Sequence, residues 1–347
     1  LCYTSGTTGN PKGVTLTNNN IISNVDNLKY MFNDLDNNMT SLNILPWAHI
    51  YGLTTELYYN IFFDNKVAIS SGPDNFVKEC REIKPNALYL VPKVLESIKS
   101  KVSFLDKPIL NNLIPFTLKK IFGGNLITIF MGGAKLDNNT KSFYNYNGIN
   151  ICEGYGCSET SPMISVNHMK DPRNINSIGY ILPDIDVEIV NGEIQVSGPN
   201  VMQGYWNNVE ETNKVIFERN GKKWYKTGDT GYKNGNFLFY SGRKSENYKL
   251  SNGKFVNVSD VECKIKKHVN SNFIIYGQDR PYNILVTDVN IDNKTIKIIN
   301  EDPDNYLKIK KVLKLNENKF LEYLTPKMSI KRNMLINEIK DEIDKLY

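Results

Sequence analysis

The chain has 347 residues, of which 40% are hydrophobic and 23% charged, as in ordinary globular proteins that are long enough for two or three domains. Its net charge of +5 comes without a long Lys/Arg block, so the composition argues against a nucleic-acid partner. Five cysteines without a CxxC pair argue against disulfides and structural zinc, and no apolar run approaches the roughly 20 residues of a membrane span. We therefore expect a cytoplasmic protein.

The chain begins with a dense run of small hydroxylated residues and glycines, YTSGTTGNPKGV at positions 3–14. Glycines allow tight turns in which several backbone N–H groups converge on an anion, and a lysine adds positive charge. The Walker A and G-x-G-x-x-G patterns of other phosphate loops occur nowhere in the sequence. The run therefore predicts a phosphate-binding loop. Its candidate residues are Thr4, Ser5, Gly6, Thr7, Thr8, Gly9 and Lys12.

Strand-like and helix-like segments alternate in the following part of the chain. VAIS (67–70) predicts a strand, NFVKECREI (75–83) has the apolar spacing of a helix, and ALYLVP (87–92) is typical of a buried strand. NLITIFMGG (125–133) and NICEGYG (150–156) each predict a strand that ends in a glycine turn. This alternation favours an α/β fold with a largely parallel sheet, whose ligands bind at the carboxyl ends of the strands.

From about position 177 the pattern changes to short strands and turns, including a hairpin centred on Asn234-Gly235. A further unit begins near Gly242–Glu246, where Ser259 and Glu262 predict a capping box ahead of a helix. The predicted organisation is an α/β part at 1–176, a β-rich part at 177–243 and a C-terminal unit at 246–347.

Further motifs follow the phosphate loop in a fixed order. They are LPWAHIYGLTTEL (45–57), MGGAKL (131–136), EGYGCSET (153–160), YKTGDTGY (225–232), SGRKSENYKLSNGKFV (241–256) and TPKMSIKR (325–332). Together with YTSGTTGNPKGV, they resemble the motifs of the adenylate-forming superfamily, which contains acyl-CoA synthetases, peptide-synthetase adenylation domains and luciferases. The forms PWAHIYG, NYKLSNGKFV and TPKMSIKR are nearest those of the long-chain fatty acyl-CoA synthetase branch.

The resemblance implies both a fold and a reaction. The implied fold has a large domain of parallel α/β sheet layers with a small β-barrel-like subdomain, and a small mobile α+β C-terminal domain after a hinge near 244–246. In the implied reaction a fatty acid carboxylate attacks the α-phosphate of ATP, giving an acyl-adenylate and pyrophosphate. The thiol of coenzyme A then displaces AMP. ATP, Mg²⁺ and coenzyme A are the implied cofactors, and the resemblance implies no particular oligomeric state.

The resemblance also assigns roles around the phosphates. The phosphate loop would hold the departing pyrophosphate, and Glu159 together with Thr4 would hold Mg²⁺, a hard cation that prefers oxygen ligands. Lys331 would bridge the substrate carboxylate and the α-phosphate, and His49 would lie beside that carboxylate. Glu159, Lys331 and His49 form the implied catalytic set.

Other implied roles concern the nucleoside and coenzyme A. Tyr155 would lie against the adenine, Asp229 would accept hydrogen bonds from the ribose hydroxyls, and Arg243 would add a donor. The loop LSNGKF (250–255) would face coenzyme A. The remaining residues that the resemblance places in these sites are Gly133, Ala134, Gly154, Gly156, Ser158 and Gly253.

Two departures from the family pattern matter for function. Ser245 stands where the family has a charged hinge residue, which removes a charge but leaves the backbone free to rotate. Family members also carry a long portion before the phosphate loop, which supplies one sheet layer and part of the acyl pocket wall. We therefore expect the sequence to be the C-terminal portion of a longer protein, in which the upstream part could provide peripheral membrane contact. Two alternatives stay open: acyl transfer to a carrier-protein thiol, and a nucleotide-binding module without turnover.

Overall fold

The computed structural model describes residues 1–4, 11–33, 35, 38–105, 110–168, 176–301, 304–324 and 330–347. The described residues form two compact units, and each is considered by itself. Unit 1 consists of Leu1–Thr4, Lys12–Thr227 and Tyr232–Tyr240. Unit 2 contains Gly228–Gly231 and Ser241–Tyr347.

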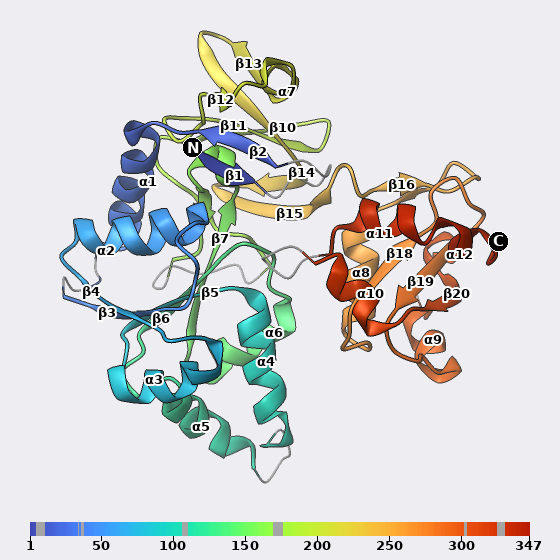
Figure 1. The fold of residues 1–347 in the computed structure, drawn as a ribbon, viewed down its shortest axis with the longest axis horizontal. Coiled ribbons are helices and arrows are strands. Elements are labelled where there is room, and N and C mark those ends of the chain that lie inside the picture. Colours follow the sequence, from blue (N-terminus) through green and yellow to red (C-terminus); the bar gives the residue numbers. More distant parts are fainter. Residues whose placement is uncertain are drawn as a thin grey trace. The chain divides into compact units, whose positions relative to one another are not determined.

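A twelve-stranded sheet runs through unit 1 in the order β10-β11-β14-β15-β9-β8-β7-β6-β5-β3-β4, with β13 paired to β14 (Figure 1). Its strands are β3 (Thr40–Asn43), β4 (Lys66–Ile69), β5 (Ala87–Leu90), β6 (Thr128–Met131), β7 (Asn150–Gly156), β8 (Met163–Val166), β9 (Tyr180–Ile181), β10 (Asp186–Val190), β11 (Glu193–Ser197), β13 (Ile216–Arg219), β14 (Lys222–Asn234) and β15 (Phe237–Arg243). The pairs from β4 to β7 are parallel, whereas β7-β8 and β8-β9 are antiparallel. A small separate sheet joins β1 (Cys2–Thr4), β2 (Lys12–Thr15) and β12 (Gly204–Tyr205).

Helices cover both faces of the parallel strands, as the α/β prediction requires. Figure 1 shows α1 and α2 on one side of β3, β5 and β6, and α3 to α5 on the other. Strand β5 explains the arrangement, because Ala87 and Tyr89 join the core cluster that contains α1 residues, while Leu88 and Leu90 join the cluster that contains α3 to α6. The helices of unit 1 are α1 (Asn18–Met31), α2 (Tyr59–Phe62), α3 (Phe76–Ile83), α4 (Pro92–Val102), α5 (Ile114–Ile121), α6 (Asn138–Tyr146) and α7 (Val209–Val215).

The β-rich part of unit 1 is built from antiparallel hairpins. The loop Asn191-Gly192 joins β10 to β11, and Asn220-Gly221 joins β13 to β14. All four residues have positive φ (52°, 77°, 54° and 70°), as a two-residue hairpin turn with the right-handed strand twist requires. The predicted hairpin between β14 and β15 also forms, with its loop at Gly235-Asn236.

Unit 2 contains a three-stranded sheet with helices and a two-stranded ribbon. Its strands are β16 (Tyr248–Lys249), β17 (Phe255–Val256), β18 (Phe273–Tyr276), β19 (Asn283–Thr287) and β20 (Ile309–Lys314). Its helices are α8 (Val258–Lys266), α9 (Asn293–Ile299), α10 (Glu317–Glu322), α11 (Arg332–Glu338) and α12 (Lys340–Asp344). Strand β19 is buried along its length and separates two core clusters, one around α8 and one around α10 to α12.

The predicted capping box at Ser259 and Glu262 is wrong. Helix α8 begins two residues earlier than the box requires, with Asn257 instead of Ser259 as its N-cap and no side-chain cap hydrogen bond. The Glu262 carboxylate instead accepts hydrogen bonds from the Ile275 backbone N–H (3.0 Å) and from Arg332 Nη2 (2.6 Å). A long-range charged partner therefore outcompetes the local cap, since hydrogen bonds between ionised groups are about twice as strong as neutral ones.

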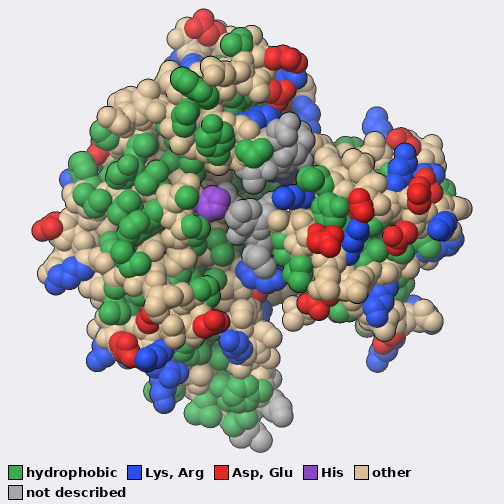
Figure 2. Space-filling view, in the orientation of Figure 1, with side chains coloured by type: hydrophobic (Ala, Val, Ile, Leu, Met, Phe, Trp, Pro, Cys, Tyr) green, Lys and Arg blue, Asp and Glu red, His purple; other side chains and the backbone are tan. Residues whose placement is uncertain are grey.

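The surface of unit 1 is not uniformly polar. Figure 2 shows hydrophobic side chains gathered over the part of unit 1 that carries α1 and α2. The exposed large apolar residues in this part include Ile22, Tyr30, Ile61 and Phe62. None of the helices among the described residues is both long and apolar enough to cross a membrane.

Two neighbouring glycines after α5 provide a matched test of the packing in unit 1. Gly123 and Gly124 both have positive φ (81° and 93°), but a Cβ on Gly123 would lie 2.0 Å from the Cys80 carbonyl oxygen, whereas one on Gly124 would meet nothing within 4 Å. We expect Gly124→Ala to lower the free energy of unfolding by about 1 kcal/mol through backbone strain alone. Gly123→Ala should cost about 2 kcal/mol more, because α3 must move. Denaturant unfolding measures both values, and equal costs would contradict the described contact.

Candidate nucleotide and acyl site

The two described ends of the predicted phosphate loop lie opposite each other. Thr4 ends β1 and pairs with Lys12 at the start of β2 in antiparallel register. The hairpin therefore brings both residues to the mouth of the same loop. The predicted phosphate residues Ser5, Gly6, Thr7, Thr8 and Gly9 lie outside the described residues.

Lys12 and Glu159, predicted as phosphate and magnesium residues, meet through a tyrosine. Lys12 Nζ lies 5.0 Å from the centre of the Tyr205 ring, and the Tyr205 hydroxyl donates a hydrogen bond to Glu159 Oε1 (2.8 Å). Lys12 also forms an ion pair with Glu211, which lowers the pKa of that carboxyl to about 2. In this arrangement the Lys12 ammonium is paired with the Glu211 carboxylate, so a bound phosphate would have to displace Glu211 from Lys12.

Tyr205 was not recognised from the sequence. It lies in strand β12 and its pairing with Glu159 spans 46 residues of the chain. Its neighbour Gly204 lacks a Cβ, which would lie 2.8 Å from Thr212 Cγ2, but nothing in the sequence links this Gly-Tyr pair to Glu159. Burial raises the pKa of the Tyr205 hydroxyl, and the neighbouring Glu159 carboxylate adds to this effect, so the phenol remains a donor at neutral pH.

The EGYGCSET segment forms the end of β7 and a short 3₁₀ turn, Ser158–Thr160. Gly156 has a structural reason to be glycine, because a Cβ there would lie 1.7 Å from the Pro162 carbonyl oxygen. Similarly, a Cβ on Gly154 would lie 2.3 Å from Met163 Cε. The two glycines let β7 and the following chain approach closely. Tyr155 between them is half-buried, and its ring lies 6.1 Å from that of Tyr240.

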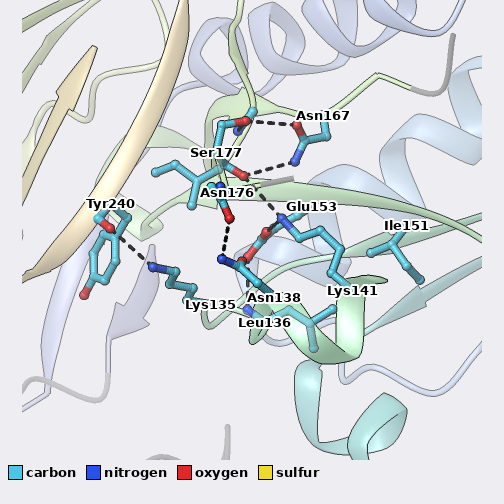
Figure 3. A network of polar contacts seen from close by, with 12 residues as sticks. Lys135, Leu136, Asn138, Lys141, Ile151, Glu153, Asn167, Asn176, Ser177 and Tyr240 are labelled. Atoms are coloured by element: carbon cyan, nitrogen blue, oxygen red, sulfur yellow. Dashed lines mark hydrogen bonds and ion pairs between the residues drawn. The ribbon is translucent and has the colours of Figure 1, made fainter. Parts of the chain in front are cut away.

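The MGGAKL turn is joined to the EGYG strand by a hydrogen bond to the carboxylate of a buried ion pair (Figure 3). The Glu153 carboxylate accepts a hydrogen bond from the Leu136 backbone N–H (3.0 Å) and pairs with Lys141 Nζ on α6. The Glu153 and Lys141 side chains are 2% and 3% exposed. Lys141 Nζ also donates to the Ser177 carbonyl oxygen (3.3 Å). This network fixes the turn that contains Gly133, which has a φ of 84°, against strand β7.

Ala134 lies in this turn, next to Gly133 and two residues before Leu136. Lys135 Nζ donates to the Tyr240 carbonyl oxygen (3.4 Å), so β15 also contacts the turn (Figure 3). The predicted adenine residues Gly133, Ala134 and Tyr155 are therefore positioned by one connected set of contacts. Lys141 was not recognised from the sequence, where it is one of 42 basic residues.

His49 precedes an uncommon element, a π-helix at Tyr51–Tyr58 that continues directly into α2. Helices of this type are rare and occur frequently at functional sites. His49 begins the turn into this helix, since its backbone N–H donates to the Pro46 carbonyl oxygen (3.0 Å) and its carbonyl accepts from Leu53 (2.9 Å).

One face of the π-helix lines a narrow, partly open apolar cavity. Tyr51, Thr55 and Tyr59 line it from the helix side, and the Tyr51 hydroxyl donates across to the Phe130 carbonyl oxygen (3.0 Å). The remaining lining residues come from α1 and its C-cap and from β5 to β8: Leu28, Phe32, Tyr89, Phe130, Met131, Cys152, Gly154, Met163 and Val166. The cavity therefore lies among the strands that carry the nucleotide motifs.

Glu56 is a fully buried carboxyl group on the same π-helix. Its Oε2 accepts hydrogen bonds from Asn43 Nδ2 and from Trp47 Nε1 (3.2 Å). Burial raises the pKa of Glu56 to about 7, and the two hydrogen bonds only partly offset that effect. Nothing in the sequence distinguishes this residue from the other acidic side chains.

The predicted ribose residues come together in unit 2. Arg243 Nε lies 2.9 Å from Asp229 Oδ1, and the Asp229 side chain is 5% exposed. Gly253 of the LSNGKF loop has a φ of 80° and faces open space. Lys331 precedes α11 and is partly exposed, and its backbone N–H donates to the Tyr323 carbonyl oxygen (2.7 Å).

Comparison with known proteins agrees with the fold and the motifs. The model of the AMP-binding enzyme family matches residues 1–206. The chain belongs to this family, and its fold is that of the adenylate-forming enzymes.

Curated relatives and solved structures extend this comparison. A long-chain-fatty-acid–CoA ligase of Bacillus subtilis is 31% identical over 284 residues, which cover 77% of this chain and 48% of that protein. ATP-bound MatB from Rhodopseudomonas palustris superposes with a TM-score of 0.79 at 22% identity, covering 98% of this chain and 67% of that one. The o-succinylbenzoate coenzyme A synthetase of Bacillus subtilis, solved with ATP and a magnesium ion, gives a TM-score of 0.77 at 23% identity, covering 96% and 69%. The chain spans about half the length of the curated relatives it matches.

The Lys141–Glu153 pair can be tested by removing one charge and then both. We expect Lys141→Met to lower the free energy of unfolding by about 3–5 kcal/mol, because it leaves a carboxylate buried without its partner. Adding Glu153→Gln should restore part of this loss, since a neutral amide oxygen can still accept from the Leu136 N–H. Urea unfolding of the single and double variants measures the difference. A double variant no more stable than Lys141→Met would contradict the assignment.

Glu56 predicts a specific dependence of stability on pH. Its pKa is about 7 in the folded chain and about 4.3 when unfolded, so the folded state retains the proton that the unfolded state loses between these values. The Glu56 contribution to the free energy of unfolding should therefore fall as pH rises through this window, by about 4 kcal/mol in total. Glu56→Gln cannot ionise and should remove this part of the slope. An unchanged slope in chemical denaturation at several pH values would contradict the assignment.

Proposed function

We propose that the protein activates a fatty acid with ATP to an acyl-adenylate and transfers the acyl group to coenzyme A, releasing AMP and pyrophosphate. The observation that carries this proposal is the apolar cavity of unit 1. It shares β6 and β7 with the two adenine motifs, so an apolar chain in the cavity and a nucleotide at the strand ends would be neighbours. The ligase relatives and the long-chain form of the motifs support a fatty acid as the substrate.

The first half-reaction needs positive charge and positioning around the phosphates. Lys12 would supply charge after releasing Glu211, and its hairpin partner Thr4 would add a hydroxyl. Glu159 and Thr4 offer the hard oxygen donors that suit Mg²⁺, so these residues fit the ion. When bound, Mg²⁺ would neutralise charge on the phosphate oxygens. The Tyr205 hydrogen bond would hold the Glu159 carboxylate in a fixed orientation.

Unit 2 would contribute the nucleoside contacts and the lysine. Asp229 is buried and already oriented by Arg243, so its oxygens could accept hydrogen bonds from ribose hydroxyls at little cost in ordering. Lys331 would hold the carboxylate and the α-phosphate together during adenylate formation. The ammonium group is suited to this role because it pairs with both anions as they react.

A groove in unit 2 supports coenzyme A as the acceptor. Lys254 from the LSNGKF loop and Lys310 from β20 line it together with the rings of Tyr282 and Tyr306. Residues 1–240 carry equal numbers of basic and acidic side chains, so the whole net charge of +5 lies in residues 241–347. Aromatic faces beside lysines are suited to a flat base that carries phosphates, as in the nucleotide end of coenzyme A.

The lysine role predicts that the two half-reactions respond differently. Lys331→Ala should reduce fatty acid-dependent pyrophosphate release from ATP by a factor of about 10² or more, the usual effect of removing one transition-state contact. Thioester formation from supplied acyl-adenylate should survive. Lys340→Ala, which changes an exposed lysine of α12, is the matched control. Equal loss of both half-reactions in Lys331→Ala would contradict the role of this lysine. If the unmodified protein releases no pyrophosphate with any acid from acetate to oleate, the proposed function is contradicted.

The acceptor groove predicts an effect on coenzyme A alone. We expect Lys254→Glu and Lys310→Glu each to raise the KM for coenzyme A by about tenfold or more, since each reverses a charge beside a polyanion. Lys267→Glu, an exposed lysine after α8, should leave that KM unchanged. Steady-state kinetics with coenzyme A or purified acyl carrier protein as the sole acceptor provides the measurement. Turnover with the carrier protein only would favour carrier-protein transfer instead.

A further inference from the structure

We propose that Glu56 is a positioning residue that fixes the segment bearing His49 against the π-helix and so shapes the carboxylate end of the acyl cavity. The inference rests on the proposed function, because it concerns how the acid substrate is held. Glu56 itself does not line the cavity, so it would act through the residues that it holds.

The first part of the argument is the position of the two groups that Glu56 binds. Asn43 is the last residue of β3, and its side chain also donates to the Leu45 carbonyl oxygen (2.9 Å). Trp47 lies two residues before His49. Because one carboxylate oxygen accepts from both Asn43 and Trp47, it ties the beginning and the middle of the loop to a single point on the π-helix.

The second part is the close packing of this loop on the helix. A Cβ on Gly52 would lie 3.3 Å from the Pro46 carbonyl oxygen and 3.4 Å from Trp47 Cδ1. Together with the backbone hydrogen bonds of His49 to Pro46 and Leu53, this contact leaves the loop little freedom to move. The same helix presents Tyr51 and Thr55 to the cavity, so displacement of the loop would also change the cavity wall.

The third part is the cost of the burial. Glu56 is 0% exposed, and within the described residues its Oε1 has no hydrogen-bond partner and its carboxyl has no ion pair. An apolar side chain of similar size would fill this position without that desolvation cost. A buried carboxyl that accepts from two loop groups is therefore better explained by orientation of the loop than by stability of the fold.

The test compares variants at Glu56 by their separate effects on the two substrates. Glu56→Ala should raise the KM for the fatty acid about tenfold, equivalent to about 1.4 kcal/mol, with little change in the KM for ATP. Glu56→Gln should largely restore the KM, since its amide oxygen can accept from both donors. Thr54→Val is the matched control, because Thr54 is buried on the same helix and its hydroxyl has no partner among the described residues.

A double-variant cycle tests whether Glu56 acts through Trp47. Trp47→Phe removes the ring N–H and should raise the KM for the fatty acid in the unmodified protein, but have no further effect once Glu56 is alanine. Additive effects, or an equal rise in both KM values, would overturn the proposal. If Glu56→Ala does not fold, the effect of Trp47→Phe decides: a rise in the fatty acid KM supports the proposal, and no change overturns it.

Amide hydrogen exchange provides a readout that does not depend on turnover. Glu56→Ala, or Trp47→Phe if that variant does not fold, should speed exchange at the His49 and Leu53 amides, while the amides of β7 and β8 stay protected. Glu56→Gln should not have this effect. Loss of protection throughout unit 1, or unchanged protection at the His49 and Leu53 amides, would overturn the positioning role. Absence of any acid-dependent reaction would instead contradict the proposed function and leave this measurement valid.

Discussion

The buried ion pair between Lys141 and Glu153 is the interaction on which the nucleotide side of unit 1 depends. It joins helix α6, the MGGAKL turn and strand β7, and its third contact, with the Leu136 backbone, fixes the turn itself. Removing one charge of a buried ion pair leaves the other charge buried without a partner, which strongly destabilises the fold. The remaining donor and acceptor atoms of the pair must also be hydrogen-bonded. The pair therefore fixes the MGGAKL turn against strand β7.

Strands β6 and β7 carry both polar and apolar parts of the candidate site. Strands β6 and β7 end in the glycine turns of the nucleotide motifs, yet Phe130 and Cys152 on these strands line the apolar cavity. The two environments therefore lie within a few residues of each other along the same strands. The proposed function needs such a boundary, and the Tyr51 hydroxyl donates a hydrogen bond to the Phe130 carbonyl oxygen within the apolar part.

The alternating β and α elements could be predicted from the sequence because buried strands and amphipathic helices have local signatures. The predicted hairpin at Asn234-Gly235 also formed for a local reason, since glycine accepts positive φ. The capping box at Ser259 failed because its glutamate binds Arg332, 70 residues away. Tyr205, Lys141 and Glu56 were missed for the same reason: their importance arises from contacts or burial that only the folded chain creates. The roles of the motif residues came from the resemblance, and the geometry adds the partners that hold them.

The central proposal is that this chain binds an acyl group joined to AMP. Its most direct test is calorimetric titration of the protein with a non-hydrolysable fatty acyl-adenylate mimic, with AMP and with the free fatty acid. The account predicts binding of one mimic per chain, more tightly than AMP or the fatty acid alone, because the mimic fills the apolar cavity and the nucleotide contacts together. A mimic that binds no more tightly than AMP would contradict the account.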